Sequence, residues 1–194
     1  KTHDFLFLNK IGKAHRNSLI NAFDEGFFDN SLYSNWPNIK LPAQYENTFP
    51  YPLRGKDQDI VQQQYVDSKF SLLSESSVSN DEVFMTERIW KSIIAEHPFV
   101  VHGNHLYLQK LRELGFKTFG NYFNESYDLE EDHDKRISKI VETCTTLKNM
   151  NWKDLYLQTQ DLRKYNRDVF FNKEKLGLQI NSTLKLFFEF FDRS

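Results

Sequence analysis

The sequence lacks the features that mark several large classes of protein. Its 25 Lys and Arg against 27 Asp and Glu give a formal net charge of −2, so it has no basic excess. Proteins that bind nucleic acids or anionic membranes normally carry such an excess. No apolar run approaches the roughly 18 residues of a membrane span, and the run 5–8, flanked by charge, is not typical of a signal peptide.

Cysteine and glycine are both scarce. The single Cys144 excludes an internal disulfide and fits a reducing, cytoplasmic compartment; its apolar helical setting predicts an inert core residue. The seven glycines form neither a Gly-x-Gly-x-x-Gly loop nor a P-loop, which counts against dinucleotide-dependent dehydrogenases and nucleoside triphosphatases. Ser74 and Ser126 lack the Gly-x-Ser-x-Gly elbow of hydrolases.

Strand and helix patterns alternate along a chain that is rich in aromatic residues. Hydrophobic residues make up 39% of the sequence and aromatic residues 15%, enough for a sizeable core. The alternation predicts an α/β fold, a Rossmann-like parallel sheet with helices on both faces. Strands are expected at residues 5–8, 31–34, 69–74 and 99–101, and helices at 14–23, 59–66, 86–96, 104–114 and 132–148. Four of the five prolines lie in residues 35–55, which are expected to form a long connection.

The chain is expected to divide into a Rossmann-like unit over residues 1–150 and a helical extension over residues 151–194. The extension has the pattern of two helices, and the second, around residues 184–191, is apolar almost all round. Such a helix is expected to pack on the first unit, on a further N-terminal domain, or against a second copy of the chain.

Ligands of open α/β sheets bind beyond the carboxyl ends of the strands. Three strand-to-helix connections, 9–16, 74–88 and 102–105, therefore mark the candidate site. Each leads into a helix N-terminus, where free N–H groups and the helix dipole favour an anion. His15 and Arg16 are cations that oppose this dipole, which suggests an anionic partner; alternatively, Arg16 pairs with Asp24 or Glu25.

Residues 86–91 carry the densest group of charges in these connections. Glu87 and Lys91 are four apart, the spacing of an ordinary ion pair on a solvated helix face. The functional alternative is that Arg88 and Lys91 hold a diphosphate while Glu87 accepts hydrogen bonds from a ribose diol.

Three other groups of residues admit a functional reading. His97, His102 and His105 could ligate a metal, although their spacing around a strand does not imply that they converge. The acidic residues 130–134 have the pattern of a solvated helix start. The aromatic residues in 118–127 could stack on a base or sugar, but packing in the core is the simpler reading.

Two motifs resemble a known family. Phe-Met-Thr-Glu-Arg-Ile-Trp-Lys-Ser-Ile at 84–93, followed by His-Pro-Phe-Val-Val-His-Gly at 97–103, resembles the nucleotide-sugar-binding half of GT-B glycosyltransferases. The resemblance is closest to the fucosyltransferase-like and exostosin-like groups and to related bacterial and phage proteins. Its flanks, residues 5–9 with His15-Arg16, 114–119 and 125–128, extend it over about residues 4–148.

The resemblance implies sugar transfer from a nucleoside diphosphate donor, with no metal or other cofactor. It implies that Glu87 contacts the donor ribose and that Arg88, where the family usually has Lys, contacts the phosphates. The other residues that it places at the donor are His15, Arg16, Glu75, Thr86, Lys91, Gly103 and Asn104. It does not identify the general base, the acceptor, the nucleotide base or the sugar. It also does not distinguish inversion from retention at the sugar.

GT-B enzymes have two Rossmann-like domains, so a chain of 194 residues is expected to be the donor-binding half alone. The alternative is a non-catalytic structural or protein-interaction module that keeps the glycosyltransferase-like fold.

Overall fold

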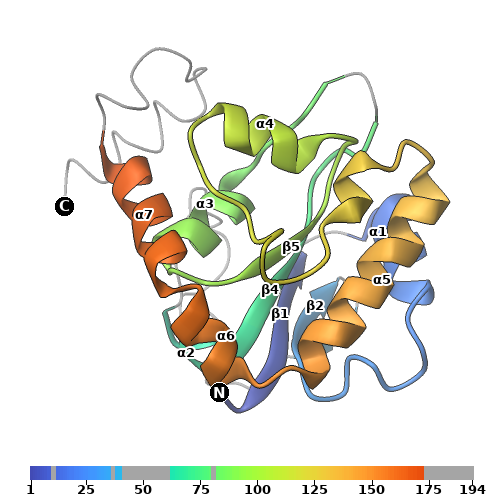
Figure 1. Ribbon diagram of the computed structural model, residues 1–194. Helices are drawn as coiled ribbons and strands as arrows, with labels where there is room; N and C mark the ends of the chain where they lie inside the picture. Colours follow the sequence, from blue (N-terminus) through green and yellow to red (C-terminus); the bar gives the residue numbers. More distant parts are fainter. Residues whose placement is uncertain (10–11, 36–37, 41–61, 80–81, 173–194) are drawn as a thin grey trace, which may run out of the picture.

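The computed structural model describes residues 1–9, 12–35, 38–40, 62–79 and 82–172 (Figure 1). Its strands are β1 (His3–Asn9), β2 (Leu32–Asn35), β3 (Asn38–Lys40), β4 (Ser68–Ser74) and β5 (Phe99–His102). Its helices are α1 (Ala14–Asn21), α2 (Gln62–Asp67), α3 (Glu87–Ile94), α4 (Tyr107–Glu113), the 3-10 turn η3 (Ser126–Leu129), α5 (His133–Asn149), α6 (Trp152–Gln158) and α7 (Gln160–Phe171).

The strands form one sheet in the order β3-β2-β1-β4-β5. Strands β2, β1, β4 and β5 are parallel, and β3 is antiparallel to β2 at the edge. This arrangement confirms the predicted α/β, Rossmann-like fold. The chain leaves β1 for β2 on one side and later returns as β4 on the other side. The strand order therefore reverses between β1 and β4, which is where open α/β sheets bind their ligands.

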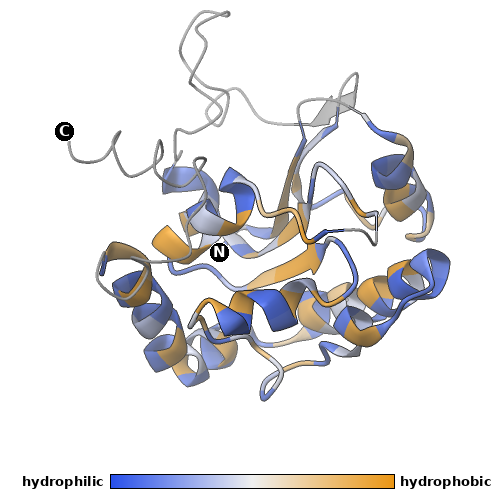
Figure 2. Ribbon diagram, turned by 90° about the horizontal axis from the view of Figure 1, so that it is seen from above, coloured by the Kyte–Doolittle hydropathy of each residue, from blue (hydrophilic) through white to orange (hydrophobic). Residues whose placement is uncertain are grey.

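Helices cover both faces of the sheet (Figure 1). Helices α1 and α5 lie on one face, while α2 and α3 lie on the other, with α6 and α7 outside α3. Because both faces are covered, the strands are continuous apolar runs: Phe5, Leu6 and Phe7 of β1 are at most 3% exposed. Figure 2 shows the apolar sides of the helices turned towards the sheet. No helix in the described ranges is long and apolar enough to cross a membrane.

The described part of the extension packs on α3. Ile89, Trp90 and Ile93 of α3 are all at most 4% exposed, and the burial of each such side chain contributes about 1.5–3 kcal/mol. The Trp90 ring lies 5.9 Å from that of Phe170 in α7. The apolar helix expected at 184–191 lies outside the described residues.

One local expectation is wrong. Asn104 was expected to begin a helix, but α4 begins at Tyr107 after Leu106, whose φ is 61°. The Asn104 side chain instead accepts a hydrogen bond from the Phe84 backbone N–H at 3.0 Å and donates to the Ser79 carbonyl. The proline-rich connection 35–55 contains β3, a strand of three residues at the sheet edge; most of that connection lies outside the described residues.

Candidate functional site

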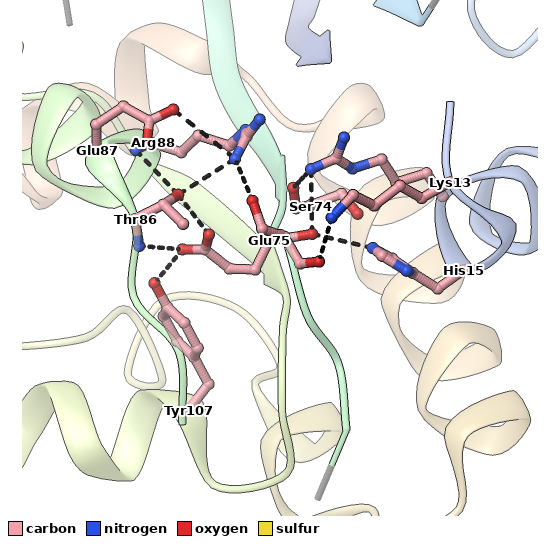
Figure 3. Close-up of polar contacts among 10 residues, drawn as sticks. Lys13, His15, Ser74, Glu75, Thr86, Glu87, Arg88 and Tyr107 are labelled. Carbon is pink, nitrogen blue, oxygen red and sulfur yellow. Dashed lines mark hydrogen bonds and ion pairs between the residues drawn. The ribbon is translucent and has the colours of Figure 1, made fainter. Parts of the chain in front are cut away.

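Residues from three distant segments gather at the carboxyl ends of β1 and β4. The connection after β1 and the start of α1 bring Lys13, His15 and Arg16 to this place. The end of β4 brings Ser74 and Glu75, and the start of α3 brings Thr86, Glu87 and Arg88. Figure 3 shows these side chains converging from both sides on the backbone around Glu75.

Glu75 is a fully buried carboxylate at the centre of the group, with 0% exposure. It accepts hydrogen bonds from the Thr86 backbone N–H at 3.2 Å, the Thr86 hydroxyl at 2.5 Å and the Tyr107 hydroxyl at 2.6 Å. Burial raises the pKa of Glu75, and these hydrogen bonds oppose the rise in part. Glu75 therefore ties the end of β4 to the start of α3, and it acts as an organiser of the site.

Gly103 acts at the site through Tyr107. A Cβ atom at Gly103 would lie 2.6 Å from Cδ2 of the Tyr107 ring, which real structures essentially never show. The missing side chain therefore lets Tyr107 reach Glu75. Gly103 and Asn104 were expected to contact an anion, but the described contacts give both a role in holding neighbouring segments in place.

The first turn of α3 presents one acid and one base at the surface. Thr86 caps the helix, its hydroxyl accepting from the Arg88 backbone N–H. The Arg88 guanidinium Nη1 donates to the Ser76 hydroxyl at 3.4 Å and the Thr86 hydroxyl at 3.3 Å. Its distance to the Glu87 carboxylate is 3.8 Å, with side-chain exposures of 16% for Arg88 and 29% for Glu87. Among the described residues this loose pair is the only ion pair of Arg88, so its charge is weakly compensated.

Three cationic side chains approach the end of β4 from the side of α1. Arg16 Nη2 donates to the Ser74 and Glu75 carbonyls at 3.4 and 3.3 Å. His15 Nε2 donates to the Glu75 carbonyl at 3.0 Å, and Lys13 Nζ donates to the Ser76 carbonyl at 2.8 Å. Burial and, to a smaller extent, the charge of Arg88 lower the pKa of Arg16 to about 10, while Glu75 and Glu87 act in the opposite direction. The printed hydrogen bonds of these three basic side chains all run to backbone carbonyls at the end of β4.

The ion pairs that the sequence spacing suggested for Arg16 do not form among the residues that the structure describes. Within the described ranges, no ion pair joins Arg16 to Asp24 or Glu25; its guanidinium lies at the end of β4. Lys91 lies one turn farther along α3, and the described contacts around Glu75 do not include it. The structure thus brings together most of the residues predicted for the site, with Lys91 at its margin.

Sequence reasoning missed Lys13, Tyr107 and Phe84. Lys13 lies in a connection that the sequence already marks, and the argument that selected His15 applies to it equally. Phe84 is 51% exposed beside the start of α3, where it offers a flat apolar face to a ring. No spacing or motif signals Tyr107, because its contact with Glu75 depends on the packing at Gly103.

The three histidines around β5 do not converge. His97 precedes the strand and bonds the Ser71 hydroxyl at 2.8 Å and the Ser68 carbonyl at 2.9 Å, while His102 ends the strand. Within the described ranges no group of three His, Cys, Asp or Glu is placed to hold a metal ion. Cys144 is fully buried, and burial raises the pKa of its thiol.

No family model, curated protein or solved structure matches this chain. What the site can do therefore has to be judged from its own residues. They supply four basic side chains, the N-termini of α1 and α3, and one surface carboxylate, Glu87. Together these groups suit a ligand with a strongly anionic part beside neutral hydroxyl groups.

Proposed function

We propose that this chain is the donor-binding half of a GT-B-type glycosyltransferase, which holds a nucleoside diphosphate sugar at the carboxyl ends of β1 and β4. One observation carries the proposal. Arg16 and Arg88, from the starts of two different helices, meet at the point where the strand order reverses. The resemblance of residues 84–103 to the donor-binding motifs of that family points in the same direction.

The diphosphate would lie between α1 and α3. Both helices begin at this end of the sheet, and each start carries a partial positive charge. Arg88, whose side chain is 16% exposed, can donate two parallel hydrogen bonds to a phosphate, and Arg16, 2% exposed, would contribute its charge from a buried position. Lys13, exposed at the rim, would contribute a third cation.

Glu87 would bind the ribose. Its carboxylate is adjacent to Arg88 and 29% exposed, so a ligand can reach it. Two acceptor oxygens match the two hydroxyl donors of a ribose diol. The buried carboxylate of Glu75 would support both neighbours by fixing the start of α3.

In sugar transfer, the bond between the anomeric carbon and the diphosphate oxygen breaks while the acceptor oxygen bonds to that carbon. Negative charge then grows on the leaving diphosphate, and Arg16, Arg88 and Lys13 would stabilise it without a metal ion. The acceptor and the base that removes its proton would be held by a second domain. A cytoplasmic location would suit such a donor and the free Cys144.

Calorimetric titration of the purified chain with GDP, UDP, ADP and CMP tests the proposal. We expect one nucleotide to bind, and Glu87→Gln and Arg88→Gln each to weaken that binding tenfold or more, about 1.4 kcal/mol. Glu113→Gln and Arg167→Gln, which change exposed charges on α4 and α7, are the matched controls. No binding to a chain shown to be folded would contradict the proposal and favour a non-catalytic interaction module with this fold.

A further inference from the structure

A second polar cluster lies at the same end of the sheet, on the face covered by α1 and α5. Successive residues of a strand point to opposite faces, so Ser74 points away from the Glu75 carboxylate. The Ser74 hydroxyl lies 3.1 Å from His102 Nδ1, and His102 Nε2 lies 3.1 Å from His133 Nε2. The His15 ring is 5.7 Å from that of His102. Histidines of α1, β5 and α5 therefore meet here.

A buried arginine adjoins these histidines. Arg136 of α5 is 1% exposed, and its Nη1 donates to the Glu130 and Glu131 carbonyls at 2.5 and 3.3 Å. Its Nε and Nη2 atoms are buried and have no hydrogen-bond partner in the described structure. A buried donor without a partner costs about 1–3 kcal/mol, and more when it is charged. An anion beside Arg136 would remove that cost.

The charges that act on His102 all have one sign. After burial itself, the pKa of His102 is lowered by His133, His15, Arg136 and Arg16. Carboxylates lie only at the margin of the cluster. Asp134, 95% exposed, is 3.5 Å from His133 Nδ1, and Asp128, Glu130 and Asp132 act on Arg136 from a distance. Within the described ranges, no ion pair joins Arg136 to a carboxylate.

We propose that His15, His102, His133 and Arg136 form a binding site for a phosphate-type anion on the α1–α5 side of β4. Basic side chains from α1, β5 and α5 surround the place, which suits a compact anion with several oxygens. The N-terminus of α5, a helix of 17 residues, adds its partial positive charge. His15 and His133 are half-buried and reachable from solvent, with His102 and Arg136 beneath them. The site uses neither Glu87 nor Arg88 and so does not depend on the proposed function.

The short distance between His102 and His133 links anion binding to protons. With 3.1 Å between the two Nε2 atoms, only one of these atoms carries a proton, which it donates to the other. Two imidazolium groups at that distance would repel each other unless an anion lay beside them. A bound anion would favour the protonated form of His102, whose pKa burial and the neighbouring cations otherwise hold well below 6.5. Binding therefore tightens as the pH falls and takes up protons.

Calorimetric titration of the whole chain with sulfate, a tetrahedral dianion that does not titrate in this range, tests the site. We expect at least threefold tighter binding at pH 6 than at pH 8, and at least fivefold weaker binding in His133→Gln at pH 6. Lys135→Gln, an exposed position on α5, should change the affinity less than twofold. Circular dichroism and thermal unfolding of each variant verify the fold.

Three results would overturn the inference: no sulfate binding by the folded wild type, equal losses in Lys135→Gln and His133→Gln, or a loss in Arg88→Gln that His133→Gln does not share. The last result would place the anion at the proposed donor site. A failed nucleotide titration with a normal sulfate result would reject the donor proposal alone. If a bound nucleoside diphosphate displaces sulfate, the anion is a phosphate of the donor; if sulfate binding is undisturbed, the anion is a separate group. In both cases His133→Gln must weaken sulfate binding.

Discussion

His97 and His102 are buried histidines at opposite ends of β5, and they show how differently the two ends of the sheet are built. Burial lowers the pKa of both. His97 Nε2 faces the Ser68 carbonyl at 2.9 Å, which can only accept, so Nε2 carries the proton. Its Nδ1 then accepts from the Ser71 hydroxyl at 2.8 Å. His97 is therefore held neutral, with both ring nitrogens satisfied.

His102 has partners that do not fix its state. The Ser74 hydroxyl and the His133 ring can each donate or accept, so the protons of this chain can be rearranged. Neighbouring cations lower the pKa of both histidines: Lys1 and Arg163 act on His97, and His133, His15, Arg136 and Arg16 act on His102. At His97 the hydrogen bond to the Ser68 carbonyl opposes this effect and is larger than the contribution of either cation. The hydrogen bonds at the amino end therefore fix the protonation state of His97, whereas those at the carboxyl end leave the proton positions around His102 open.

The largest effect is expected from removing each imidazole. His97→Ala leaves a cavity and takes the partner from the Ser68 carbonyl and the Ser71 hydroxyl, so we expect a loss of about 3–4 kcal/mol in the free energy of unfolding. His102→Ala leaves a similar cavity but relieves a cluster of cations, and a loss of about 1–2 kcal/mol is expected. Urea unfolding at pH 7.5 measures both. Equal losses would show that the two ends do not differ in this way.

Lowering the pH should reduce the stabilising contribution of His97. The pKa of His97 is lowered from 6.5 to about 3 in the folded chain. Below pH 6.5 the unfolded chain therefore binds more protons at this position. Its stabilising contribution is present above 6.5 and is lost as the pH falls towards 3, by up to about 1.4 kcal/mol per pH unit. Urea unfolding between pH 7.5 and 4 should give a shallower loss in His97→Gln, which retains hydrogen-bonding groups.

Adding sulfate to the same experiment distinguishes the contribution of His102 to the acid sensitivity from that of His97. An anion bound at the carboxyl end would raise the pKa of His102 towards its usual value and reduce the acid loss in the wild type and in His97→Gln. It should not do so in His102→Gln. An unchanged slope in His97→Gln without sulfate would contradict the role assigned to His97.

The fold is predictable because buried strands and amphipathic helices leave regular patterns. The strand expected at 69–74 is β4, Ser68–Ser74, and the helix expected at 132–148 is α5, His133–Asn149. In both segments, tertiary packing and local pattern favour the same structure. The sequence did not predict β3, because a strand of three residues is too short to show a periodic pattern. The helix start predicted at Asn104 was wrong because asparagine, a good helix cap, is equally common in turns.

From the sequence, the candidate site can be predicted only as a set of strand-to-helix connections, without the contacts of individual side chains. Because ligands bind where parallel strands end, the sequence selects the segments that carry Arg16, Glu75 and Arg88. Which way a side chain points within those connections depends on packing, as the contact between Gly103 and Tyr107 shows. The cluster of His15, His102 and His133 joins positions far apart in the chain, and no spacing in the sequence reveals it.

The smallest effect is expected at Glu75, with the opposite sign to that of His97. Burial raises the pKa of Glu75 above its usual 4.5, so the folded chain keeps this proton to a higher pH than the unfolded chain. Its contribution is therefore full below pH 4.5 and is lost as the pH rises through the folded pKa. Glu75→Gln removes this change, so the stability of the wild type relative to Glu75→Gln should fall between pH 4.5 and 8.

Tyr107→Phe provides the matched test of the cause. It keeps the Glu75 carboxyl group but removes a hydrogen bond that favours the carboxylate, so the pKa of Glu75 should rise further and the fall with pH should extend to higher pH. Urea unfolding of the three proteins across this range measures the effect. A wild-type advantage that stays constant from pH 4.5 to 8 would mean that Glu75 is as well solvated in the folded chain as in the unfolded one. The carboxyl end of β4 would then not be the low-dielectric site in which Arg16 and Arg88 bind a phosphate strongly.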